Sequence, residues 1–234
     1  MKDMVKDKVI VITGSSSGLG KGLAEILAVQ GAKVVVSAPN LPADTKALES
    51  IAIAIGGDAV TADVRNENEV DSLAKKAVEH FGRIDIWINN AGIWLPKAPI
   101  EDIDMKKARD LFDVNVFGCL NGCRAALKVM KKQGSGVIVN IVSTAALSGR
   151  AFSLVYSASK HAERGVTDSL REELKEEKSR IKVIGIYPGG MKTDLFGKAK
   201  PDDYDKYMSV ESVAHKIIVN LGKNDPQDEL VIEA

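Results

Sequence analysis

The stretch KVIVITGSSSGLGKG, residues 8–22, decides the fold. Its β-branched first half predicts a buried strand, and the residues after the glycines begin a helical pattern. Between them Gly14, Gly18 and Gly20 follow the spacing G-x3-G-x-G. A glycine-rich turn at a helix N-terminus allows backbone N–H groups to approach a pyrophosphate. The stretch therefore favours the first βα unit of a dinucleotide-binding fold, although such a turn can also be purely structural.

The end of the second apolar run bears on the choice of dinucleotide. About 20 residues after the glycine turn, an acid usually reads the ribose of NAD, or an arginine accommodates the 2′-phosphate of NADP. Here that position reads SAPN, so Ser37, Ala38 and Asn40 occupy it without an acid or an arginine. A missing carboxylate removes the repulsion of a 2′-phosphate. The sequence thus favours NADP(H) over NAD(H), although the usual cation is missing too.

The rest of the chain alternates apolar runs with longer helical patterns. We expect further strands at 33–38, 58–64, 84–92, 136–143, 181–189 and 229–234, and helices at 21–31, 43–55, 67–82, 105–132, 153–178 and 209–222. Such alternation implies parallel βαβ units with helices on both faces of the sheet. The predicted fold class is α/β, a doubly wound, Rossmann-like parallel sheet of about seven strands. We expect one domain over residues 1–234.

Composition narrows the classes of partner. The 234 residues carry 32 Lys plus Arg and 32 Asp plus Glu, which gives no electrostatic reason to expect nucleic acid or an anionic membrane. No apolar run is long enough to span a bilayer, and the start lacks a signal-peptide core, so we expect a cytoplasmic protein. Cys119 and Cys123 have no neighbouring His or Cys cluster, so we expect buried or interfacial free thiols and no metal site.

The stretch SLVYSASKHA, residues 153–162, places Tyr156 and Lys160 four residues apart. On a helix this spacing puts an ammonium beside a phenol, and a positive charge favours the ionised phenol. A proton donor that works near neutral pH is one consequence. The alternative is an ordinary helix in which the lysine stem lies against an aromatic ring.

These features occur in an order that resembles the short-chain dehydrogenase/reductase family, in its simple single-domain branch. The resemblance runs nearly end to end. It is carried by TGSSSGLG (13–20), ADV (62–64), NNAG (89–92), Asn115 in DVNVFG, Ser143 at 13 residues before Tyr156, YSASK (156–160) and PGGMKT (188–193).

The resemblance implies four catalytic residues. Tyr156 would be the general acid in carbonyl reduction and the base in alcohol oxidation, and Lys160 would assist it and hold the nicotinamide ribose. Ser143 would bind the substrate oxygen, and Asn115 would anchor a water in a proton path. Asn115 could instead satisfy backbone groups at a helix irregularity.

The resemblance also implies the residues around the dinucleotide. Asp63 could instead cap a turn, and Thr193 could be a helix cap. The expected set is Gly14, Ser16, Ser17, Gly18, Leu19, Gly20, Ser37, Ala38, Asn40, Asp63, Val64, Asn90, Ala91, Gly92, Tyr156, Lys160, Pro188, Gly189 and Thr193.

The expected function is NADPH-dependent reduction of a ketone or aldehyde to an alcohol. The alternatives are an NAD-dependent alcohol dehydrogenase that works oxidatively, and a catalytically idle dinucleotide-binding regulatory protein. Residues 190–208 would form a short, charged lid over a fairly open site. The candidate substrate residues are largely apolar, which favours a substrate with a hydrophobic body: Trp94, Ser143, Leu147, Phe152 and Met191.

The two longest expected helices, 105–132 and 153–178, predict self-association. Both carry many small or apolar residues, including Gly118, Gly122 and Ala125 in the first. Small residues allow a neighbouring helix to approach closely, so we expect a homodimer or homotetramer formed through these helices. The alternative is a monomer whose small residues pack only on its own sheet.

Overall fold

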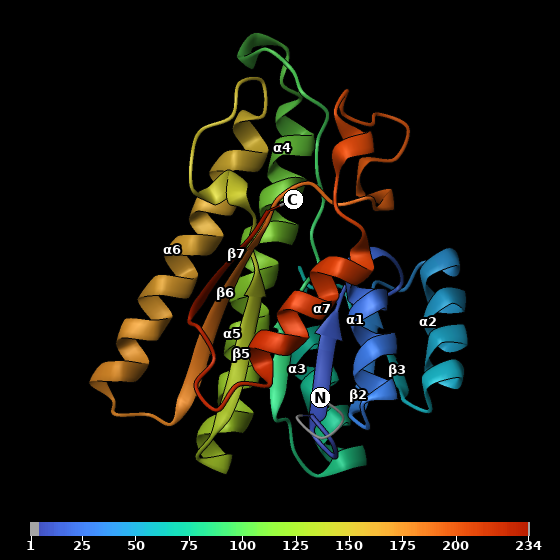
Figure 1. Cartoon of the computed structure of the whole chain (residues 1–234), viewed down its shortest axis with the longest axis vertical. Coiled ribbons are helices and arrows are strands. Elements are labelled where there is room, and N and C mark those ends of the chain that lie inside the picture. Colours follow the sequence, from blue (N-terminus) through green and yellow to red (C-terminus); the bar gives the residue numbers. More distant parts are fainter. Residues whose placement is uncertain (1–4, 234) are drawn as a thin grey trace.

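A computed structural model describes residues 5–233. The chain alternates strands and helices, and all neighbouring strands pair in parallel (Figure 1). The strands are β1 (Val9–Thr13), β2 (Lys33–Ala38), β3 (Asp58–Thr61), β4 (Ile86–Asn89), β5 (Gly136–Ile141), β6 (Ile181–Pro188) and β7 (Glu229–Ile232). The α-helices are α1 (Gly18–Val29), α2 (Pro42–Ile55), α3 (Glu67–Phe81), α4 (Met105–Phe112), α5 (Gly118–Gln133), α6 (Leu154–Glu176) and α7 (Val210–Leu221).

The strand order is β3-β2-β1-β4-β5-β6-β7, which confirms the expected doubly wound parallel sheet. The order reverses between β1 and β4, so the connections after these two strands diverge and leave a crevice at their carboxyl ends. Ligands of open α/β sheets bind in such a crevice. The segments near residues 95–104, 144–153 and 190–208 all rise above this edge of the sheet (Figure 1).

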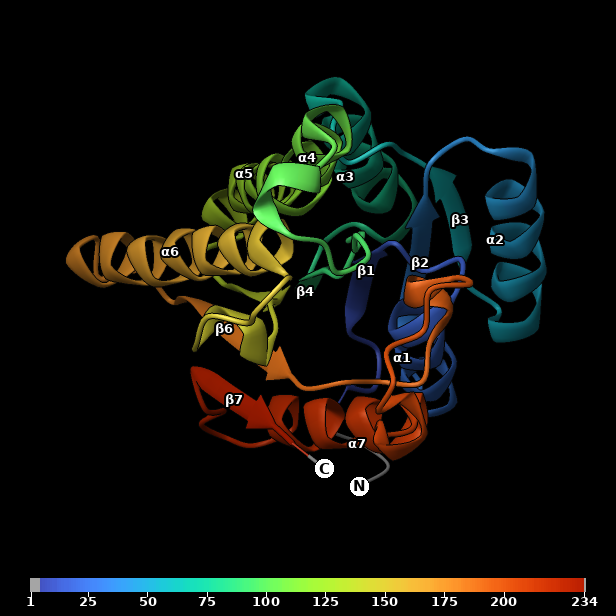
Figure 2. The ribbon, with the colours of Figure 1, turned by 90° about the horizontal axis from the view of Figure 1, so that it is seen from above.

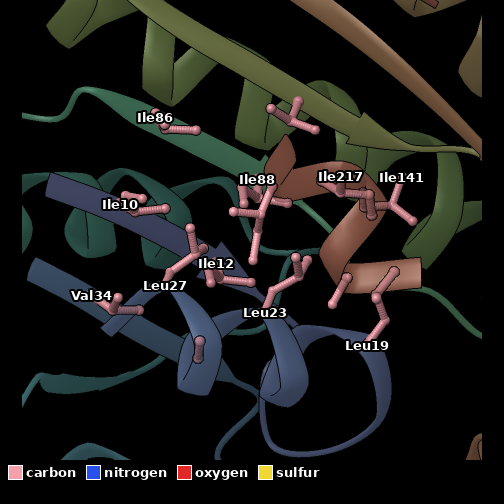
Figure 3. Packing of buried hydrophobic residues seen from close by; sticks show 14 of the residues in the cluster. Ile10, Ile12, Leu19, Leu23, Leu27, Val34, Ile86, Ile88, Ile141 and Ile217 are labelled. Carbon is pink, nitrogen blue, oxygen red and sulfur yellow. The ribbon is translucent and has the colours of Figure 1, made fainter. Parts of the chain in front are cut away.

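Each face of the sheet is buried by its own set of helices. Ile10 and Ile12 of β1 lie in one hydrophobic cluster with residues of α1, α2 and α7, whereas Val11 lies in a second cluster with residues of α3, α5 and α6. Figure 2 shows α1 and α7 on the opposite side of the sheet from α3, α5 and α6, and Figure 3 shows the first cluster. Burial on both faces explains the near-continuous Val and Ile runs of the strands.

The expected helix 105–132 is interrupted. Helix α4 ends at Phe112, residues Asp113–Phe117 form a π-helical turn, and α5 begins at Gly118. A π-turn adds a residue to the helix and is frequent at functional sites. Here the turn contains Asn115, whose side chain is buried and bonded to the backbone that follows β4.

Residues 190–208 are irregular, as expected. They contain only short 3₁₀ turns, at Asp194–Phe196 and Tyr204–Lys206, and Met191 pairs with Met208 to close the base of the segment. The expected strand 229–234 is observed as β7, and Ala234 lies outside the described residues. Within residues 5–233, each helix is too short or too polar to cross a bilayer.

Candidate active site

The glycine turn after β1 is shaped by close backbone contacts. Gly14 has φ of +62°, and a Cβ there would lie 2.6 Å from the Cα of Ala91. A Cβ on Gly20 would lie 2.5 Å from both Asn90 Nδ2 and the Gly14 carbonyl oxygen. Only glycine fits these two positions without movement of the backbone. The turn therefore leaves a cradle at the N-terminus of α1 that fits a pyrophosphate.

Asn90 holds this cradle from the β4 side. Its side-chain Nδ2 donates to the carbonyls of Thr13 at 2.9 Å and Gly14 at 2.8 Å, and its backbone N–H donates to Thr13 Oγ1 at 3.1 Å. These bonds tie the carboxyl ends of β1 and β4 together. The side-chain amide of Asn90 therefore donates both of its hydrogen bonds to the glycine turn. Ala91 and Gly92 follow it in the sequence, along the crevice.

The start of α2 places an unexpected carboxylate beside the glycine turn. Ser16 Oγ donates to Asp44 Oδ1 at 2.7 Å, and Asp44 lies in the first turn of α2. Ala38 is buried, while Asn40 is exposed and accepts a bond from Thr45. Asp44 was not among the expected site residues because it follows residues 37–40 in the sequence. The available signal was an acid in the first turn of the next helix, where the helix dipole favours it.

Asp63 and Val64, expected near the adenine, have partners of their own. The Arg65 side chain donates to both carboxylate oxygens of Asp63, and this interaction lowers the pKa of Asp63 below its usual value. Asp63 Oδ1 also accepts the Arg65 backbone N–H at 3.0 Å, as a turn cap does. The Val64 side chain is buried, and its carbonyl accepts from Asn121.

Asn115 is buried and bonds to the segment that follows β4. Its Oδ1 accepts the backbone N–H of Ile93 at 2.8 Å, and its Nδ2 donates to the Ile93 carbonyl at 3.0 Å and to Ser159 Oγ at 3.2 Å. A Cβ on Gly92 would lie 3.4 Å from Asn115 Oδ1 and 3.8 Å from Lys160 Nζ. Asn115 therefore satisfies backbone groups, and the π-turn also brings it close to Lys160.

Tyr156 and Lys160 are both on α6, as expected. Lys160 Nζ lies 5.7 Å from the centre of the Tyr156 ring and donates to the carbonyl of Ile141, at the end of β5, at 3.3 Å. The lysine is 5% exposed, whereas the tyrosine is half-buried. The ammonium is consequently buried at the carboxyl edge of the sheet, and the phenol stands closer to solvent.

A third ionisable side chain of α6, Glu163, adjoins the lysine. Its two carboxylate oxygens lie 2.8 and 2.9 Å from Lys160 Nζ, and its side chain is buried. Burial raises the pKa of Glu163 to about 7 against the opposing effect of Lys160. Burial alone would lower the pKa of Lys160, but Glu163 and Tyr156 outweigh it and the pKa is raised. Glu163 was not among the expected site residues, although its spacing of three from Lys160 predicts a shared helix face.

Ser143 lies two residues beyond β5, where a 3₁₀ turn, Thr144–Ala146, begins. Its Oγ accepts the backbone N–H of Ala145 at 3.1 Å and lies 3.5 Å from the carbonyl of Pro188, the last residue of β6. The next residue, Gly189, donates its backbone N–H to the carbonyl of Ile232 at 2.8 Å. Ser143 is thus fixed between the carboxyl ends of β5 and β6.

Residues 190–208, the expected lid, are held by aromatic contacts. Phe196 meets Trp94 edge to face with ring centres 5.1 Å apart, and Tyr204 and Tyr207 complete the cluster. Tyr204 and Tyr207 were not among the expected site residues, because charged residues dominate the sequence of this segment. Their signal was a pair of aromatic residues three apart within a polar stretch. Thr193 Oγ1 caps the first lid turn, and its side chain lies 3.6 Å from the Cβ position of Gly18.

The other candidate substrate residues are spread around the rim. Phe152 is 62% exposed and has φ of +61°, a region that bulky residues rarely adopt. It borders a hollow of about 180 Å³ that Tyr156 and Leu95 also line. Leu147 is exposed, and Met191 packs partly on the first core cluster. The structure therefore brings Phe152 and Tyr156 to one hollow, and Met191 lies closer to the core than expected.

The remaining expected cofactor residues differ in which of their groups can reach a ligand, the backbone or the side chain. The side chain of Leu19 packs in the core (Figure 3), so only its backbone faces the turn, while Ser17 is exposed at the start of α1. Ser37 is buried, and its backbone N–H donates to Ser15 Oγ at 2.7 Å. Among residues 5–233 no cluster of three potential metal ligands occurs, and Cys119 and Cys123 are buried free thiols.

Known proteins with similar sequences and structures agree with this arrangement. The short chain dehydrogenase family matches residues 8–204. An uncharacterised oxidoreductase of Staphylococcus saprophyticus is 36% identical over 98% of this chain and 95% of its own, and one of Staphylococcus aureus is 35% identical over 93% and 92%.

Solved structures give the same result. A 3-ketoacyl-(acyl-carrier-protein) reductase from Brucella melitensis, complexed with NADH, has a TM-score of 0.87 at 27% identity and 97% coverage of both chains. A short-chain dehydrogenase from Streptomyces avermitilis has a TM-score of 0.84 at 29% identity, with 98% and 89% coverage. With the crevice and its side chains in the expected order, this chain belongs to the short-chain dehydrogenase family of oxidoreductases and is an enzyme that uses a nicotinamide dinucleotide.

Proposed function

We propose that this enzyme reduces a ketone or aldehyde with a hydrophobic body to the alcohol, with Tyr156 as the proton donor. One observation carries the proposal. Tyr156 borders a hollow that Leu95 and Phe152 also line, with charged residues at Lys97, Asp102, Asp104 and Lys107, and the buried ammonium of Lys160 lies 5.7 Å from the centre of its ring. A proton donor with a fixed positive charge beside it suits protonation of a carbonyl oxygen.

In the proposed mechanism the chain's own residues position the carbonyl and supply its proton. The bound dinucleotide supplies the hydride. Ser143 Oγ, which lies between β5 and β6, would turn its one proton from the Pro188 carbonyl, 3.5 Å away, to the substrate oxygen and stabilise the developing negative charge there. Tyr156 transfers its proton to that oxygen, and the charge of Lys160 favours the phenolate that remains. Asn115 supports the backbone beside Lys160.

For the dinucleotide we propose NADP(H), with only a modest preference over NAD(H). The absence of an acid at residues 37–40 supports NADP(H) because nothing on that strand end repels a 2′-phosphate. Asp44 opposes it, since its carboxylate accepts from Ser16 at 2.7 Å beside the same turn. A carboxylate there weakens the binding of a further anion, which limits the preference.

The aromatic lid supports an apolar substrate. Trp94, Phe196 and the two tyrosines of residues 190–208 form one cluster, so this segment offers aromatic surface that its charged sequence does not suggest. We propose that residues 190–208 act as the substrate lid of a one-domain enzyme. An oxidative role uses the same residues in reverse, with Tyr156 as the base.

We also propose a homodimer formed through α5 and α6. The small residues of α5 do not support it, because Gly118 packs on Val64 and a Cβ on Gly122 would lie 1.8 Å from Asn89 Oδ1. They serve the approach of α5 to its own sheet. The support comes from an open groove of about 660 Å³ between α5 and α6, which Leu120, Leu127 and Leu170 line. Leu120 is 40% exposed and the neighbouring Phe117 is 55% exposed.

Light scattering tests the dimer. We expect a mass near two or four chains for the parent, and dissociation for Leu120→Glu. Ile53→Glu is the matched control, because Ile53 is an exposed apolar residue of α2, on the other face of the sheet. A parent mass near one chain would exclude the dimer.

A substrate screen tests the activity. NADPH and NADH oxidation would be followed with a panel of ketones, aldehydes and quinones, and NAD(P)⁺ reduction with the matching alcohols. We expect turnover of at least one apolar carbonyl with NADPH. If the protein binds a dinucleotide tightly but turns over none of these substrates, the regulatory protein would be favoured instead. If alcohol oxidation with NAD⁺ is faster than carbonyl reduction, the oxidative enzyme would be favoured.

A further inference from the structure

The helix face that carries Tyr156 and Lys160 continues to a buried acid. Tyr156, Lys160 and Glu163 occupy positions i, i+4 and i+7 of α6, so they form one stripe along the helix. Glu163 is 3% exposed and both its carboxylate oxygens lie within 3 Å of Lys160 Nζ. The mechanism described above does not use this carboxylate.

Stability does not account for this ion pair. Taking two charges out of water is costly, and replacing a buried pair by apolar residues is often neutral or stabilising. Among the described residues, Glu163 Oε1 makes no hydrogen bond of good geometry beyond its ion contact with Lys160. A carboxylate that is poorly satisfied and in contact with the proposed catalytic lysine points to a role in the reaction.

The charged and titratable neighbours of Glu163 are few. Within the described residues they are Lys160 on its own helix, which adjoins Tyr156, and on α5 the Cys119 thiol, which adjoins Cys123. Strand β5 contributes the uncharged carbonyl of Ile141, which also accepts from Lys160. Burial raises the pKa of Glu163 to about 7, so above that pH its negative charge offsets the charge of the ammonium.

We propose that Glu163 is a positioning residue that holds Lys160 and cancels part of its field at Tyr156, so that the phenol keeps its proton to higher pH. The proposal rests on the proposed function, in which Tyr156 is the proton donor. The carboxylate thereby favours carbonyl reduction, which needs the phenol, over alcohol oxidation, which needs the phenolate. It also competes for Lys160 with the nicotinamide ribose.

The size of the effect follows from the helix geometry. Seven residues along a helix separate Glu163 from Tyr156 by roughly 10 Å. A unit charge at this distance, with an effective dielectric constant of about 20, shifts a titration by roughly one pH unit. Glu163→Gln removes the charge and keeps the volume, so the midpoint of the Tyr156 titration should fall by about that amount.

The test follows Tyr156 by NMR in the protein without dinucleotide. Tyrosine labelled with ¹³C at Cζ gives one resonance per ring, and Tyr156→Phe identifies the resonance of Tyr156. The titration midpoint is compared in the parent, Glu163→Gln, Glu163→Asp and Glu172→Gln. Glu172 is the matched control because it is an exposed glutamate of the same helix, paired with Lys175 at 3.3 Å. We expect a lower midpoint only in Glu163→Gln, and a midpoint near that of the parent in Glu163→Asp.

Folding and kinetics complete the experiment. If circular dichroism shows that Glu163→Gln does not fold, the parent protein alone tests the proposal. Its Tyr156 resonance should then show an inflection near pH 7, because Glu163 ionises there. In folded variants the alkaline loss of kcat for reduction should move to lower pH in Glu163→Gln by the same amount as the NMR midpoint.

Two results would overturn the proposal. The first is a Tyr156 titration midpoint in Glu163→Gln that lies within about 0.3 pH unit of the midpoint in the parent. The second applies if Glu163→Gln does not fold: it is a Tyr156 resonance of the parent that shows no inflection near pH 7. The NMR result is independent of turnover. A parent without carbonyl reductase activity would therefore contradict the proposed function, while an unmoved Tyr156 titration would contradict only the role of Glu163.

Discussion

The two walls of the crevice are built differently. On the proposed dinucleotide side, Gly14, Gly20 and Asn90 form the wall through backbone contacts and hydrogen bonds to carbonyls. On the proposed substrate side, Phe196 of residues 190–208 packs edge to face on Trp94. A wall made of backbone contacts tolerates few residue types at each position, whereas a wall made of rings tolerates many. The first can therefore be recognised by a motif, and the second cannot.

The largest effect is expected on the dinucleotide wall. Gly20→Val places side-chain carbons where Asn90 Nδ2 and the Gly14 carbonyl lie, within 2.5 Å of the Cβ position. We expect a loss of dinucleotide affinity of roughly 100-fold, measured by calorimetry, because overpacking costs about 1–3 kcal/mol. Gly149→Val is the control, since a Cβ at Gly149 meets no atom within 4 Å. Equal affinity in both variants would show that the turn is not a tight cradle.

A smaller effect is expected where this wall meets the ribose. Ala38→Asp adds an acid at the end of β2 and should shift binding toward NADH by about tenfold, through repulsion of the 2′-phosphate. Asp44→Asn removes the carboxylate beside Ser16 and should increase the preference for NADPH several-fold. Calorimetry with both dinucleotides measures each change. Tighter NADH binding by the parent would refute the preference for NADP(H).

The smallest effect is expected on the substrate wall. Trp94→Ala removes the edge-to-face contact with Phe196, and such a contact contributes about 0.5–1.5 kcal/mol. We expect KM for the carbonyl to rise by about three- to tenfold, with dinucleotide affinity unchanged. Tyr204→Phe is the control, because it keeps the ring and loses only the contact with the Thr193 carbonyl. A comparable loss of dinucleotide affinity in Trp94→Ala would show that the two walls are not independent.

The sequence was sufficient to predict the fold and the order of the site. The glycine turn and the Val and Ile runs specify parallel βαβ units, and the sheet has the expected strands and faces. The spacing of Tyr156 and Lys160 predicts a shared helix face, and both lie on α6. Such features depend on local backbone geometry and on the spacing of residues along a helix or strand, and both can be inferred from a single sequence.

Contacts between distant segments were not predictable. The interruption of the helix at Asn115 depends on bonds to Ile93, 22 residues away, and the carboxylate beside Ser16 comes from Asp44, 28 residues away. The small residues of α5 were assigned to a partner surface, but they pack on the chain's own sheet. The small residues indicate that something packs closely on α5. Only the three-dimensional structure shows which part of the protein does so.

The central claim is that Tyr156 donates the proton, and one substitution tests it most directly. Tyr156→Phe keeps the ring and removes the hydroxyl. With the best carbonyl from the screen, we expect kcat to fall by at least ~100-fold, the usual contribution of a general acid, while dinucleotide affinity by calorimetry stays within a few-fold of the parent. A Phe variant that retains kcat within a few-fold of the parent would contradict the account.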